Sequence, residues 1–111
     1  MSKQLLIFIL NKEEFLDEIL EAFIELDISG ATIIDSIGMG RILAHDIPIF
    51  AGFRNLMQES RAGNKTIFTV VEEQKIERVV KAIEQIIGPL NSPGTGIIVT
   101  LPVGSLYGMP K

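Results

Sequence analysis

The order of its apolar segments constrains this chain most. A run of six apolar residues, Leu5 to Leu10, is typical of a strand buried in a sheet. Two further segments rich in β-branched residues follow, Ala31 to Ile37 and Lys65 to Val71, and a fourth spans Gly96 to Val103. Pro102 places the end of the fourth segment at a sheet edge or a bulge.

Two segments between these strands have helical spacing. The first follows Asn11, which can cap it in a capping box with Glu14, and Gly30 can end it in the left-handed conformation. The second begins near Glu72 and Glu73, and Gly88-Pro89 ends it. The apolar residues of the first are Phe15, Leu16, Ile19, Leu20, Phe23, Ile24 and Leu26, and those of the second are Ile76, Val79, Val80, Ile83, Ile86 and Ile87.

The resulting order is strand, helix, strand, long loop, strand, helix, strand. Two right-handed βαβ units in this order predict an α+β, ferredoxin-like βαββαβ sandwich, in which one antiparallel four-stranded sheet carries both helices on one face. We expect residues 1–111 to form a single domain with a loop or arm at 41–64. The strands are apolar at nearly every position, and 47% of all residues are hydrophobic, so we expect another subunit to cover the open face of the sheet.

The charge of the chain is unevenly distributed. Residues 1–40 contain two cations and eight anions, whereas residues 41–65 contain four cations and two anions. An acidic body with a locally basic loop argues against nucleic-acid binding, which needs a broad positive surface. The loop leaves room for a small anionic ligand or an acidic partner.

Other classes are disfavoured by what the sequence contains. With no cysteine and one histidine, a disulfide or a stable transition-metal centre is not expected. The apolar run at the N-terminus is too short for a signal peptide or a membrane span, which predicts a soluble, cytoplasmic protein without membrane insertion. His45-Asp46 is the only base-and-carboxylate pair of note, and adjacent residues rarely orient each other, so we expect no enzyme activity.

Glycines mark two segments as candidate binding sites. Gly38-Met39-Gly40-Arg41 follows the second predicted strand, and Gly94-Thr95-Gly96 precedes the fourth. Glycines let backbone N–H groups approach phosphate oxygens closely, and Arg41 can add a bidentate contact.

The loop between these segments contains a second pattern. Its apolar residues have helical spacing, which predicts a short helix over 48–60. We expect this arm to dock onto a partner protein or onto its own oligomer through Ile47, Phe50, Phe53 and Met57.

The whole chain resembles the PII signal-transduction proteins. The resemblance rests on the strand order, on Gly30-Ala-Thr-Ile-Ile-Asp-Ser-Ile-Gly-Met-Gly-Arg41, on a loop of about twenty residues, and on Gly94-Thr-Gly-Ile-Ile-Val-Thr-Leu-Pro-Val103. It implies a non-enzymatic homotrimer that binds ATP or ADP in clefts between subunits and signals through the loop to an enzyme, transporter or regulator, in nitrogen regulation. By the same resemblance, the candidate ligand-binding residues are Gly38, Gly40 and Arg41 on one wall of each cleft and Gly94, Thr95 and Gly96 on the other.

Three departures from the family pattern concern the ligand. Ile42 stands where the family has a glutamine used with magnesium and 2-oxoglutarate, and Ile97 stands where it has a phosphate-binding lysine. Residues 104–110 replace an arginine-rich strand. Each lost charge-assisted contact removes about 1.5–3 kcal/mol. We therefore expect a different or weaker effector; an adenine nucleotide stays a candidate, and no cofactor is assigned.

Two alternatives have the same element order. An ACT-like module would bind an amino acid between subunits, but such modules have shorter connections between the middle strands than the loop after Arg41. A PII-shaped scaffold would bind no ligand and act through its loop alone.

Overall fold

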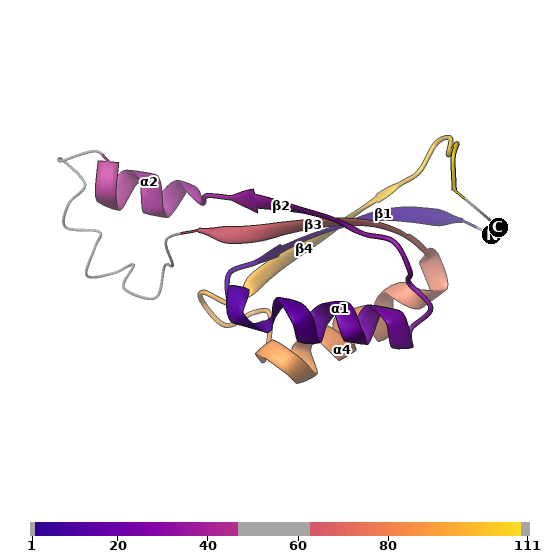
Figure 1. The fold of residues 1–111 in the computed structure, drawn as a ribbon, viewed down its shortest axis with the longest axis horizontal. Coiled ribbons are helices and arrows are strands. Elements are labelled where there is room, and N and C mark those ends of the chain that lie inside the picture. Colours follow the sequence, from indigo (N-terminus) through magenta and orange to yellow (C-terminus); the bar gives the residue numbers. More distant parts are fainter. Residues whose placement is uncertain (1, 47–62, 110–111) are drawn as a thin grey trace.

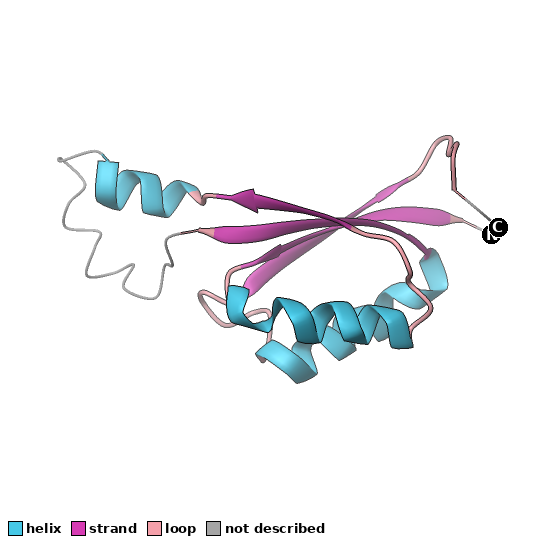
Figure 2. Ribbon diagram, viewed as in Figure 1, coloured by secondary structure: helices cyan, strands magenta, loops and turns pink. Residues whose placement is uncertain are grey.

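The computed structural model describes residues 2–46 and 63–109. Its four strands are β1 (Lys3–Leu10), β2 (Thr32–Ser36), β3 (Asn64–Glu72) and β4 (Gly96–Pro102). They form one antiparallel sheet in the order β2-β3-β1-β4, and both long helices lie on one face of it (Figures 1 and 2). The predicted βαββαβ sandwich is therefore confirmed.

The two long helices are α1 (Leu16–Glu25) and α4 (Ile76–Ile87), and each follows a short 3-10 turn, η1 (Glu13–Phe15) and η3 (Glu73–Lys75). Alternation along the central strands sends one set of side chains toward these helices. These strand side chains pack against the inward faces of the helices. The fully buried residues of this core are Leu6, Phe8, Leu10 and Ile67 from the strands and Ile19, Val79 and Ile83 from the helices. The core thus lies between the sheet and the two helices.

The start of α1 differs from the prediction. Lys12, not Asn11, precedes the 3-10 turn, and no side chain caps it. The Oδ1 atom of Asn11 instead accepts a hydrogen bond from Nδ2 of Asn64 at 3.2 Å. The side chain of Asn11 therefore bonds to the neighbouring strand at the end of the sheet and does not cap the helix.

The end of α1 differs as well. The left-handed residue is Asp27, with φ of 63°, and not Gly30. The N–H of Ile28 donates to the carbonyl of Phe23 at 2.8 Å, and the N–H of Asp27 donates to that of Ile24 at 3.0 Å. This is the hydrogen-bond pattern of a Schellman motif, which satisfies the last carbonyls of the helix. The predicted stop at Gly88 is confirmed, since Gly88 follows α4 with φ of 95°.

A further helix, α2 (Met39–Asp46), occupies the start of the predicted loop. Figure 1 shows that it extends from the end of β2, away from the two helices that cover the sheet. The predicted long connection between the second and third strands is confirmed, and its start forms this helix, which the sequence did not lead us to expect. The helix predicted over 48–60 lies outside the described residues.

Candidate functional site

The end of the sheet nearest α2 gathers the ends of all four strands. In the strand register, Ser36 pairs with Asn64, and Leu10 pairs with both Lys65 and Gly96. Both glycine segments predicted to bind a ligand therefore lie at this end. They occupy opposite edges, because β2 and β4 are the two edge strands.

The first segment lies where β2 gives way to α2. Gly38 and Arg41 are partly buried, whereas Met39 is 75% exposed. The N–H of Ile42 donates to the carbonyl of Gly38 at 3.3 Å, which closes the first turn of α2. The backbone N–H groups of this turn are the ones that a helix leaves free for an anion.

The second segment approaches β1 closely. A Cβ on Gly96 would lie 2.6 Å from the carbonyl oxygen of Ile9, so only glycine fits there without a shift. Gly94 has φ of 77°, and Thr95 is buried, with 2% of its surface exposed. The backbone of this segment therefore requires glycine at positions 94 and 96 whether or not a ligand binds there.

Within one chain the two segments do not form a common pocket. Two strands, β3 and β1, separate β2 from β4, a distance of about 14 Å at the usual strand spacing. The structure therefore brings Gly38, Gly40 and Arg41 together, and Gly94, Thr95 and Gly96 together, but not one set with the other. Ile47, Phe50, Phe53 and Met57 lie outside the described residues.

A polar network, which the sequence analysis missed, joins the two sides. Ser36 hydrogen-bonds Oδ1 of Asn64, and its Oγ lies 2.7 Å from Oγ1 of Thr66. Asn64, 9% exposed, reaches Asn11 through its Nδ2, and the N–H of Asn11 donates to the carbonyl of Thr95 at 3.4 Å. The sequence signal that could have revealed this network is Asn64 at the start of a strand, because Asn is depleted in strands and its presence there indicates a specific side-chain contact.

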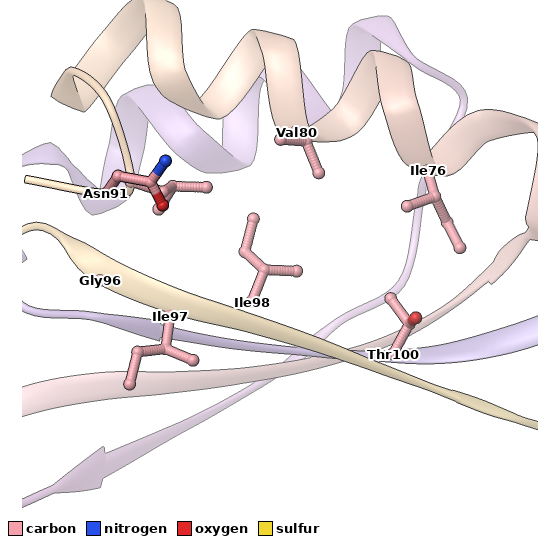
Figure 3. A pocket seen from close by; sticks show the side chains of 8 residues that line it. Ile76, Val80, Asn91, Gly96, Ile97, Ile98 and Thr100 are labelled. Carbon is pink, nitrogen blue, oxygen red and sulfur yellow. The ribbon is translucent and has the colours of Figure 1, made fainter.

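A cavity of about 460 Å³ lies between α4 and β4 (Figure 3). Its lining is mainly apolar, with Asn91 and Thr100 as polar members; the remaining residues are Ile76, Val80, Leu90, Gly96, Ile97 and Ile98. It lies on the edge of the sheet that carries the second glycine segment. Chemically it suits an apolar group better than an anion.

An ion cluster lies on the helix side of the same end. Lys65 contacts Asp35 and lies 3.5 Å from Glu13, and the hydrogen bond that Lys65 donates to Asp35 raises the pKa of Lys65 above its ordinary value of 10.5. The Lys65 side chain is 24% exposed, so it is partly buried in this cluster.

Among the described residues, no group of three or more His, Cys, Asp or Glu side chains is placed to hold a metal ion. Within the same residues, no helix is long and apolar enough to cross a membrane.

Comparisons with known proteins fit this architecture. The family model for nitrogen regulatory protein P-II matches residues 4–108, so the chain belongs to the P-II family. It is a signal-transduction protein of the PII superfamily, whose members are non-enzymatic and typically trimeric regulators of partner proteins. No curated protein matches the chain by sequence.

Two solved structures share the fold. A functionally unknown protein from Pediococcus pentosaceus ATCC 25745 matches with a TM-score of 0.66 at 18% identity, over 98% of this chain and 99% of that one. Arabidopsis thaliana PII bound to citrate matches with a TM-score of 0.63 at 18% identity, over 92% of this chain and 78% of that one.

Proposed function

We propose that the chain forms a cytoplasmic homotrimer that binds a small anionic metabolite between subunits and signals to a partner protein through residues 41–64. The observation that carries this proposal is the placement of the two glycine segments at one end of the sheet but on opposite edges. A neighbouring subunit can bring the first segment of one chain to the second segment of the next.

The open face of the sheet supports the oligomer. Side chains that point away from the helices are largely apolar on β1 and β4, and Ile34 of β2 lies on the same face. Several are well exposed in the single chain: Ile34 at 45%, Ile97 at 57%, Val99 at 46% and Leu101 at 44%. An apolar face of this extent is normally covered. Three copies related by a threefold axis would cover it.

The ligand class follows from the charges. Arg41 is the cation of the candidate site, while Ile42 and Ile97 supply none. One cation with backbone N–H groups suits a carboxylate or a nucleotide with few phosphates better than a triphosphate. The similar Arabidopsis thaliana PII structure is bound to citrate, a small anion with carboxylate groups.

Calorimetric titration with citrate, AMP, ADP and ATP, with and without magnesium, tests the proposal. Saturable binding that Arg41→Ala weakens by about tenfold or more supports the site. Binding that Arg41→Ala leaves unchanged contradicts the assignment of Arg41, and no binding across the panel favours the ligand-free scaffold.

A further inference from the structure

We infer that Asn64 is a positioning residue that couples the turn before β4 to the start of α2. The role of this coupling in signalling rests on the proposed function, whereas the coupling itself is argued from the polar network. Because the Ser36 hydroxyl donates to Asn64, it accepts from the Thr66 hydroxyl, and Asn64 in turn donates to Asn11. The three hydrogen bonds therefore form a chain with a single donor-to-acceptor direction. Hydrogen bonds in such a chain strengthen one another.

The network lies where polar groups are costly. Thr66, Ser36 and Asn64 lie together at one end of the open face of the sheet, next to apolar residues such as Ile34, and Asn64 is nearly buried. A buried amide is tolerated only when it is hydrogen-bonded, so the orientation of this amide is fixed by its two partners.

The two ends of the network reach both glycine segments. Asn64 accepts a hydrogen bond from Ser36, the last residue of β2, and Ser36 lies two residues before Gly38 and three before the first residue of α2. At the other end, the backbone of Asn11 contacts the carbonyl of Thr95 at 3.4 Å. A shift of one glycine segment therefore changes the hydrogen bonds that hold the other.

Two conservative variants test the coupling without a ligand. Asn11→Asp keeps the acceptor for Asn64, and in Asn64→Asp the amide of Asn11 can turn to donate. The double variant places two carboxylates opposite each other, with no donor between them, and so removes the hydrogen bond between residues 11 and 64. Amide hydrogen exchange of Thr95, Gly96 and Ile42, whose N–H donates to the carbonyl of Gly38, is the readout, and Ser105→Ala, at an exposed serine, is the control.

The expected result is near wild-type exchange in each single variant and a rise of about two- to tenfold on both sides in the double variant. Faster exchange confined to β2 and β3, with Thr95 and Gly96 unchanged, overturns the inference. Because no ligand is added, this outcome is separate from a failure of the titration in the proposed function.

Discussion

The backbone of Gly96 passes so close to Ile9 that a Cβ at Gly96 would lie 2.6 Å from the carbonyl oxygen of Ile9. We expect Gly96→Ala to lower the free energy of unfolding by about 1–3 kcal/mol, because β4 must shift to make room. Gly104→Ala, where nothing lies within 4 Å, is the control and should be nearly neutral. Urea denaturation measures both, and equal stability of the two variants would contradict the close approach.

Asp27 ends α1 in the left-handed region, with φ of 63°. We expect Asp27→Val to destabilise the protein by about 1–2 kcal/mol, since a β-branched residue tolerates this region poorly. Asp27→Gly should leave stability unchanged or raise it. Thermal unfolding checks the pair, and a larger loss in the glycine variant would be inconsistent with the Schellman motif.

Ile83 is fully buried between α4 and the sheet. Ile83→Ala should cost about 2–5 kcal/mol through lost burial and the cavity left behind. Gln85→Ala, at an exposed position of the same helix, should change stability by less than about 0.5 kcal/mol. Denaturation by guanidinium chloride measures the difference.

Val99 lies on the open apolar face and is 46% exposed in the single chain. We expect Val99→Lys to dissociate the proposed trimer, because a charge cannot be buried there without a partner. Gln85→Lys, on the helix side, is the control. Analytical ultracentrifugation decides the matter: an unchanged mass for Val99→Lys would exclude this face from the interface.

The pKa of Lys65 is raised by its hydrogen bond with Asp35. A raised folded pKa means that this contribution to stability is complete below 10.5, the ordinary value, and is lost as the pH rises through the higher folded pKa. Asp35→Asn should lower the pKa of Lys65. NMR titration of the Lys65 side chain between pH 9 and 12 checks this, with Lys81 as an exposed reference.

The fold was predictable because periodicity reports burial. Nearly continuous apolar or β-branched runs marked the strands, and the spacing of Val79, Ile83 and Ile87 marked the face of α4 that meets the core. The helix ends were less predictable: Asn11 has the residue type of a cap, yet a tertiary contact with Asn64 takes its side chain. Sequence alone does not show such competition between local and distant partners.

The candidate site was only partly predictable for a similar reason. Glycines marked both segments, but their placement on opposite edges follows from the strand order, which depends on long-range pairing. α2 was missed because glycines at 38 and 40 favour a loop by their propensity, and the helix begins at Met39 all the same.

The apolar open face has a consequence for handling the protein. A chain held apart from its copies would expose Ile97, Val99 and Leu101 along an edge strand, which is the arrangement that recruits further strands. Dilution or a disrupting substitution would then lead to aggregation as readily as to a stable single chain, and assembly would protect the protein as well as serve its signalling.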